Sequence, residues 1–190
     1  MTTPPRAAFE IRIEPAASAD DAALVAGIAD LVNEVYEVAE AGLWVKGARR
    51  TNRQEVAELI VLGEIATART GDRVVGAVRV RRLDDEAAEF GMLAADPTQR
   101  SLGVGRALVA FAEDWAAKRG FVEMQLELLV PIAWEHPSKE FLRAWYTRLG
   151  YRVVRSGRLE EWYPELAPLL AAECDLAIFR KALTPHDLVG

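Results

Sequence analysis

The sequence predicts an α/β (α+β) domain with a central mixed, mostly antiparallel twisted sheet of about seven strands, flanked by about four helices. Short segments with alternating apolar and polar residues indicate strands, and longer segments with apolar residues at helical spacing indicate helices. Their order is one strand, two helices, three strands, and then a helix, a strand, a helix and two strands. We expect a single domain over residues 1–190, with a flexible tail at 1–8, because this length suits one hydrophobic core.

The first half of the chain predicts a strand, two helices and a three-stranded antiparallel meander. Ser18 or Asp20 is a suitable N-cap for the first long helix. Asn52 followed by Glu55 is a capping-box pattern that begins a shorter second helix. We expect strands over 9–14, 64–70, 73–82 and 87–95, the first helix over 20–40, and a loop over 42–51.

The second half of the chain predicts helices and strands in alternation. The apolar period changes at Asp96, and the third helix that follows ends at Gly120. Ser138 is the expected N-cap of a fourth helix, which ends at Gly150 and turns inward Phe141, Leu142, Trp145 and Leu149. We expect strands over 121–130, 151–155 and 174–181, with a proline-containing insert over 159–173.

The composition argues against several kinds of function. The chain has one cysteine, Cys174, and two histidines without metal-ligand spacing, so we expect neither a disulfide nor a metal. The net charge of −6 argues against a dedicated nucleic-acid binder. No apolar run approaches the roughly 18 residues that a membrane span needs. We therefore expect a soluble, cytoplasmic protein without nucleic-acid or membrane partners.

A glycine-containing turn joins the predicted strand 87–95 to the third helix. Gly103 and Gly105 lie where that helix begins, so its first backbone N–H groups and its dipole favour an anion. The dinucleotide fingerprint requires glycine or alanine where this chain has Leu108, and a P-loop requires Gly-Lys-Ser/Thr where it has Gly105-Arg106-Ala107. Neither nucleotide-binding fold is supported. A tight turn without a ligand remains an alternative explanation of Gly103 and Gly105.

Two segments resemble the GNAT superfamily of acyl-CoA N-acyltransferases. The segment Arg100-Ser101-Leu102-Gly103-Val104-Gly105 matches the family's Gln/Arg-x-x-Gly-x-Gly/Ala pyrophosphate loop, after the common entry Asp96-Pro97. The segment Trp145-Tyr146-Thr147-Arg148-Leu149-Gly150-Tyr151 matches the aromatic-Tyr pair that closes a helix before a Gly-aromatic strand start. The resemblance spans nearly all of 9–183 and agrees with the order of elements, so it implies a GNAT-like sheet.

The resemblance implies acetyl-CoA as the cosubstrate, and no metal. In the family, the strand 87–95 and its parallel neighbour 122–130 splay apart, so pantetheine can pair with free backbone groups. Ser101 and Leu102 depart from the family pattern, in which glycine and a basic residue are more common. The residues implied in cofactor binding are Met92, Leu93, Ala95, Arg100, Ser101, Leu102, Gly103, Val104, Gly105 and Arg106.

The resemblance also implies catalytic groups. An amine like that of lysine has a pKa near 10.4 and a leaving thiol one near 8.5, so a general base is useful and a general acid helps. By resemblance, Tyr146 is the general acid and Glu89 the general base, while Glu127 on the facing strand is an alternative base. Alternation places Glu89 with Gly91 and Leu93 on one face of the strand. A packed tyrosine and solvated carboxylates stay open as structural explanations.

In the family, the acceptor is recognised by the first two helices, the loop between them and the last hairpin. Here the loop contains Trp44, Arg49 and Arg50. The candidate substrate-binding residues are Trp44, Arg49 and Glu127. The expected acceptor is the amine of a small molecule or peptide, and a homodimer is a further expectation.

Two functions of other classes stay open. The chain could be a non-catalytic acyl-CoA-binding module, or a protein-interaction scaffold that uses its C-terminal hairpin. Tyr146 favours the enzyme, because a pure binder needs no acid at that position.

Overall fold

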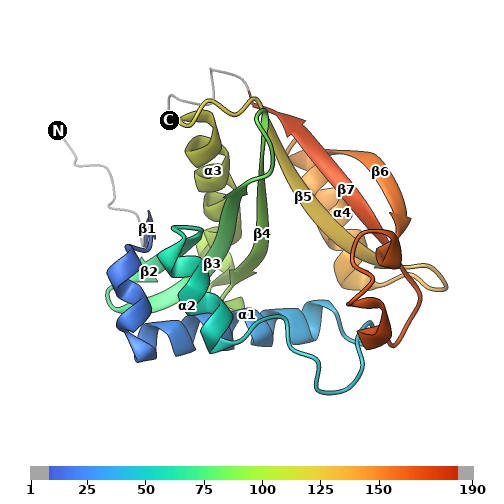
Figure 1. Ribbon diagram of the computed structural model, residues 1–190, viewed down its shortest axis with the longest axis horizontal. Coiled ribbons are helices and arrows are strands. Elements are labelled where there is room, and N and C mark those ends of the chain that lie inside the picture. Colours follow the sequence, from blue (N-terminus) through green and yellow to red (C-terminus); the bar gives the residue numbers. More distant parts are fainter. Residues whose placement is uncertain (1–8, 184–190) are drawn as a thin grey trace.

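The computed structural model describes residues 9–183. The predicted tail at 1–8 lies outside the described residues, as do residues 184–190. Figure 1 shows one twisted sheet with helices on both sides, in which one pair of neighbouring strands diverges. The predicted α/β class with a mixed sheet is confirmed.

The strands of residues 9–183 form one seven-stranded sheet in the order β1-β2-β3-β4-β5-β7-β6. Neighbouring strands are antiparallel except for β4 and β5, which are parallel. Two strands, β3 and β4, have the predicted bounds, and the others differ by a few residues at their ends. The bounds are β1 (Glu10–Ile13), β2 (Ile65–Thr70), β3 (Arg73–Arg82), β4 (Ala87–Ala95), β5 (Glu123–Pro131), β6 (Arg152–Arg158) and β7 (Cys174–Ala182).

The α-helices of the described residues are α1 (Ala22–Ala39), α2 (Arg53–Val61), α3 (Val104–Ala117) and α4 (Pro137–Arg148). The predicted N-cap of α1 is wrong. A short 3-10 helix, η1 (Ala16–Asp20), precedes α1, so neither Ser18 nor Asp20 is in the cap position. Asp21 caps the helix instead, and its carboxylate accepts from the N–H groups of Ala23 and Leu24.

The other two predicted N-caps have different outcomes. Asn52 caps α2, because its side chain accepts from the N–H of Glu55 at 3.0 Å. Ser138 does not cap α4. His136 takes that position, and its Nδ1 accepts from the N–H of Ser138 at 3.3 Å, with Pro137 as the first helical residue.

The inward face of α4 also differs from the prediction. Its buried side chains are Lys139 and Tyr146, while Phe141 is 62% exposed. Leu142, Trp145 and Leu149 are half-buried against the core. The apolar period alone therefore misplaced Phe141 and missed a buried lysine.

The two faces of the sheet have separate apolar clusters. Helices α1 and α2 pack on one face, over side chains that include Ile65, Met92 and Ala94. Helix α3 packs on the other face with Tyr146 of α4, over side chains that include Phe90 and Met124. The sheet is thus covered on both sides at β2, β3 and β4, which contribute side chains to both clusters.

A β-bulge in β4 reverses the alternation of its side chains. Gly91 pairs with Arg79 and Ala94 pairs with Ala77, so Met92 and Leu93 together face only one residue of β3. Met92 has a φ of 49°, which is uncommon for a residue other than glycine. Leu93 therefore packs with the α3 cluster. The prediction that Leu93 shares a face of the strand with Glu89 is wrong, because the bulge moves Leu93 to the opposite face.

Gly76 of β3 lets α3 approach the sheet closely. A Cβ at this position would lie 2.6 Å from Val104 Cγ1 and 2.8 Å from Leu108 Cδ1. Both contacts are too short for carbon atoms, so only glycine permits this approach. The first turns of α3 are consequently seated against β3, with the preceding turn at the end of β4.

The segment after α1 joins the two parts of the molecule. In Figure 1, α1 and the loop that follows it cross from the β1–β4 side to the side of β5, β6 and β7. Trp44 forms a β-bridge with Leu170 of the insert, and the N–H of Ala171 donates to the carbonyl of Leu43 at 2.9 Å. Leu43 is fully buried in a third apolar cluster under β5 and β7.

Candidate active site

The pairing between β4 and β5 stops early. Only three residue pairs join the strands, and the last is Glu89 with Gln125. Beyond that pair the strands diverge (Figure 1), and we call this region the splay. Strand β4 stays paired with β3, and β5 with β7, so the splay leaves one edge of each strand without a partner strand. This is the parallel pair that the sequence analysis expected to separate.

The bulge of β4 presents an amide to the splay. The phenol of Tyr36 on α1 receives hydrogen bonds from the backbone of Leu93 and from the side chain of Arg50. Burial raises the pKa of Tyr36, while the positive charge of Arg50 opposes that effect. The Leu93 amide is thus directed out of the β3–β4 ladder toward a polar oxygen.

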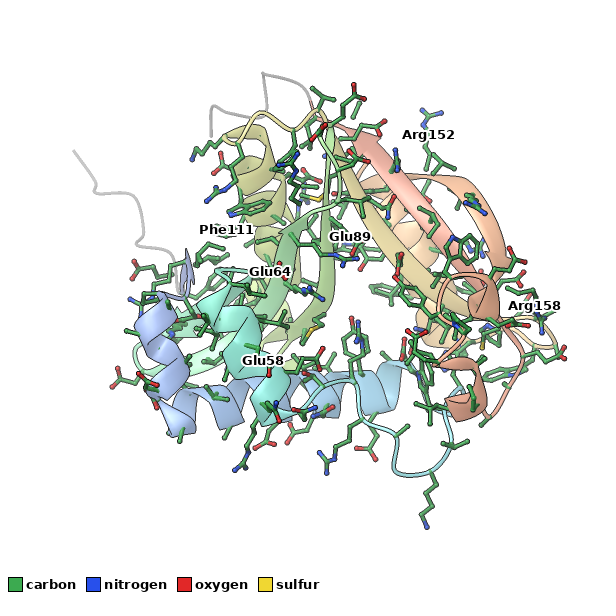
Figure 2. The ribbon with its side chains drawn as sticks, in the orientation of Figure 1. Glu58, Glu64, Glu89, Phe111, Arg152 and Arg158 are labelled. Carbon is green, nitrogen blue, oxygen red and sulfur yellow. The ribbon has the colours of Figure 1, made fainter. Side chains whose placement is uncertain are left out.

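Glu89 is buried at the point where the strands part, and it is 8% exposed. Figure 2 labels it on β4, beside the opening between the ribbons. Its Oε1 accepts from Arg81 Nε at 2.8 Å and pairs with Arg81 Nη2 at 2.7 Å. Its Oε2 accepts from Gln125 Nε2 at 3.0 Å. Both oxygens are therefore occupied by donors.

Glu127 of β5 has a different environment. Its oxygens accept from the Tyr163 hydroxyl, at 2.9 and 3.1 Å, and it has no ion pair with any residue of 9–183. Burial raises the pKa of Glu127, and the charge of Glu89 adds to this, while the Tyr163 hydrogen bond opposes it. Burial and the negative charge of Glu127 also raise the pKa of Tyr163, to about 12. A carboxylate with a raised pKa is suited to receive a proton.

Tyr146 is held by other aromatic rings. Its ring centroid lies 5.0 Å from Trp145, 6.1 Å from Phe90 and 6.2 Å from Phe179. Its hydroxyl makes no hydrogen bond within the described part of the chain. Burial raises the pKa of Tyr146, with a further contribution from Tyr36, so the phenol stays protonated. The ring is fixed and its O–H is free to donate.

The turn between β4 and α3 has a defined backbone. Asp96 caps the 3-10 helix η2 (Pro97–Leu102), with its Oδ1 accepting from Thr98 N at 2.8 Å and Thr98 Oγ1 at 2.6 Å. Gly103 adopts the left-handed conformation, φ 69°, that separates η2 from α3. A Cβ at Gly103 would meet no atom within 4 Å, so the space beside the first turn of α3 is open. Val104, Gly105 and Arg106 form that first turn.

The loop residues predicted to bind substrate lie in different surroundings. The Trp44 indole N–H donates to Glu40 Oε2 at 2.6 Å, and its ring packs on the third cluster. Arg49 is exposed. Arg50 is exposed too, but its guanidinium lies over the Tyr36 ring, 5.3 Å from the centroid, on the side of the splay.

A buried ion pair lies between the end of α1 and the start of α4. Lys139 Nζ of α4 lies 2.6 Å from Glu40 Oε1, with side-chain exposures of 3% and 9%. His136 Nε2 lies 3.1 Å from the carbonyl oxygen of Ala41. These contacts join the end of α1 to the start of α4.

Several of these residues have no signal in the sequence. Tyr36, Glu40 and Lys139 are ordinary helix residues by type and spacing, and only the fold brings them together. Tyr163 lies in the insert over 159–173, and its hydrogen bond with Glu127 spans 36 residues. A search for polar residues on otherwise apolar helix faces could have found Lys139.

Solved structures share this fold. An acetyltransferase from Streptococcus agalactiae 2603 superposes with a TM-score of 0.67 at 16% identity, over 93% of this chain and 99% of the other. Aminoglycoside 6'-acetyltransferase type Ii gives 0.63 at 20% identity, over 93% and 98%. An aminoglycoside 6'-N-acetyltransferase complexed with coenzyme A gives 0.61 at 20% identity, over 86% and 92%. At these identities the likeness shows a common fold. The comparison with curated proteins gives no match.

The fold and the groups around the splay define an acyltransferase. The model of the acetyltransferase (GNAT) family matches residues 28–151, which contain most of α1, all of α2, α3 and α4, the bulge, the glycine turn and Tyr146. The chain therefore belongs to the GNAT family, as the two sequence motifs indicated.

Two further findings concern residues 9–183. No group of three or more His, Cys, Asp or Glu side chains in this range is placed to hold a metal ion. None of the helices there combines the length and hydropathy of a membrane-spanning segment.

The carboxylates of Glu127 and Glu89 should differ in their effect on the stability of the fold. The folded protein raises the pKa of Glu127, so protonated Glu127 contributes to the stability of the fold. This stabilisation is complete below the ordinary pKa of the side chain, about 4.3, and is lost as pH rises through the raised pKa. We expect Glu127→Gln to melt higher than the parent at neutral pH, with the difference shrinking in acid. Glu89→Gln should destabilise by about 1–3 kcal/mol at neutral pH, because it removes the carboxylate from Arg81.

Thermal melts of both variants from pH 4 to 8 measure this contrast. Equal melting shifts for the two variants at neutral pH would contradict it.

Proposed function

We propose that the protein is an acetyl-CoA-dependent N-acetyltransferase, in which the amine of a small molecule or peptide attacks the thioester directly in a ternary complex. The observation that carries the proposal is the bulge of β4. It directs the Leu93 amide away from β3, next to two unpaired strand edges, with Glu127 and Tyr146 nearby.

The donor side of the site has a place for each part of acetyl-CoA. The open space at Gly103 and the first turn of α3 suit the pyrophosphate, since free N–H groups and the helix dipole favour anions. Pantetheine amides would pair with the free edges of β4 and β5. The Leu93 N–H, in place of its contact with Tyr36, would donate to the thioester oxygen as negative charge develops there.

The reaction needs one proton acceptor and one donor. As the C–N bond forms, the amine nitrogen gives up a proton, and Glu127 is better placed to receive it than Glu89, whose oxygens are already occupied. As the C–S bond breaks, sulfur takes the electron pair and accepts a hydrogen bond from the Tyr146 hydroxyl. The products are an amide and the thiolate of coenzyme A, which takes a proton from solvent as Glu127 releases one to solvent.

Acetyl-CoA binding and turnover test the proposal together. Acetyl-CoA at about 100 times its dissociation constant should stabilise the fold by roughly 2.7 kcal/mol and raise the melting temperature. Free thiol should then appear only when an amine is added. An unchanged melting curve in millimolar acetyl-CoA would contradict the assignment of acetyl-CoA as the cosubstrate. A melting shift without amine-dependent thiol release would leave a non-catalytic binding module.

Tyr146→Phe tests the donor to sulfur. The ring keeps its contacts with Phe90 and Trp145, and the lost hydroxyl has no hydrogen-bond partner within residues 9–183, so stability should change little. Turnover should fall by a factor on the order of 10²–10⁴, and less for a donor whose thiol leaves more easily. A lower melting temperature with normal turnover would make Tyr146 a packing residue.

Glu127→Gln tests the proton acceptor. At neutral pH, kcat/KM should fall by a factor on the order of 10²–10⁴. The remaining rate should rise about tenfold per pH unit toward the amine pKa near 10.4, because free amine then becomes limiting. The parent should instead level off above the raised pKa of Glu127. Parallel pH profiles for parent and variant would assign the base elsewhere.

A further inference from the structure

We propose that the acceptor is a small zwitterion, a primary amine that also carries a carboxylate, and that Arg50 binds this carboxylate while Glu127 faces the amine. This inference rests on the proposed N-acetyltransferase function and names its substrate class.

Closed ion pairs account for most charges around the splay. Glu89 is paired with Arg81 at 2.7 Å, and Glu40 with Lys139 at 2.6 Å. Each pair is internally neutral and offers little to a charged ligand. Glu55, which also feels the charge of Arg50, accepts a hydrogen bond from Thr51 Oγ1 at 2.8 Å in the first turn of α2, where the helix dipole favours a carboxylate.

Two charged side chains beside the splay, Arg50 and Glu127, have no ion-pair partner among residues 9–183. Among residues 9–183, no carboxylate lies within the 4.0 Å ion-pair distance of the Arg50 guanidinium. Glu127 likewise has only the Tyr163 hydroxyl as a partner. One free cation and one free carboxylate near the same opening match the two charges of an amino acid.

The position of Arg50 is fixed by the backbone around it. Asn33 of α1 accepts from the N–H of Arg50 at 2.9 Å and of Thr51 at 3.2 Å, and its Nδ2 donates to the Thr51 carbonyl at 3.0 Å. The guanidinium lies over the Tyr36 ring and hydrogen-bonds its hydroxyl, and Arg50 as a residue is exposed. A guanidinium held in this way can bind a carboxylate through two parallel hydrogen bonds.

Arg50 also lies near the reacting groups. The Tyr36 hydroxyl that it contacts is the one that meets the Leu93 amide, on the β4 side of the splay. The charge of Arg50 also reaches Glu127 on the β5 side. A ligand carboxylate at Arg50 would therefore place the rest of a short molecule between the bulge and Glu127.

The loop after α1, which leads to Arg50, is anchored to neighbouring elements. The loop after α1 is fastened to the insert by the Trp44–Leu170 bridge and to the start of α4 by the contact of His136 with Ala41. The buried pair of Glu40 and Lys139 fastens the same side. The loop that leads to Arg50 is thus held by contacts with the insert and with α4.

The test is an acceptor panel with thiol release as the readout. It contains glycine, β-alanine, γ-aminobutyrate, δ-aminovalerate and the common L-amino acids, with their carboxamides, plus butylamine and putrescine. We expect at least one amino acid to be acetylated, with a KM about 10–100-fold below that of its carboxamide, the range expected for one charge-assisted hydrogen-bonded contact. Arg50→Gln should raise the KM of the amino acid by the same factor and leave that of the carboxamide unchanged.

Arg53→Gln is the matched control, because Arg53 is an exposed arginine at the start of α2 and has no ion pair within residues 9–183. It should change neither KM. Calorimetric binding of the amino acid to the complex with coenzyme A should weaken in Arg50→Gln alone.

Preference for butylamine, putrescine or the carboxamides would overturn the proposal while the transferase function stands. An Arg50→Gln variant that affects acid and carboxamide equally would likewise reduce Arg50 to a structural residue. Absence of thiol release with every amine would instead count against the proposed function itself.

Discussion

The interrupted pairing of β4 with β5 is the constraint on which the rest of the structure depends. Interior strands of a sheet normally have every N–H and C=O paired, yet here pairing ends at Glu89 and Gln125. The bulge at Met92 and Leu93 then turns one amide toward the splay, and the glycine turn begins where β4 ends. A thioester lying along the free edges would have its carbonyl at the bulge and its phosphates at α3. The positions proposed for the donor and for the groups that act on it therefore follow from one break in the sheet.

The splay persists because each of its strands is stabilised separately. Strand β4 is held by β3 and by clusters on both faces, while β5 pairs with β7 along its whole length. At the narrow end, Gln125 donates to Glu89 and accepts from Arg180, each at 3.0 Å, which fixes the point of divergence. At the wide end, Lys139 and Glu40 form an ion pair. A buried pair of this kind adds little net stability after desolvation, but removing one partner is costly, so it specifies how α1 meets α4.

Local patterns predicted more of the fold than of the site. Strands β3 and β4 have the expected bounds because regular alternation defines them, and Tyr146 and Gly103 belong to contiguous motifs. The bulge could not be predicted, because Met92 gives no sign of a positive φ. The ion pair of Lys139 and Glu40 joins residues 99 apart, and the contact of Arg50 with Tyr36 depends on how a loop folds back on α1. Motifs point to the proposed cosubstrate site because that site is made of backbone, whereas the proposed acceptor site is made of side chains that only tertiary structure assembles.

Burial raises the pKa of both titratable groups in the proposed reaction, Glu127 and Tyr146, but the consequences differ. Burial raises the pKa of Glu127, which makes its carboxylate a stronger base than it is in water. Burial also raises the pKa of Tyr146, which makes the phenol a weaker acid than it is in water. Since a thiol has a pKa near 8.5, full proton transfer from this tyrosine to the thiolate would be uphill. Tyr146 is therefore better described as a fixed hydrogen-bond donor that stabilises the departing sulfur. In the proposed reaction, the pH dependence of the rate then comes from the transfer of the amine proton to Glu127.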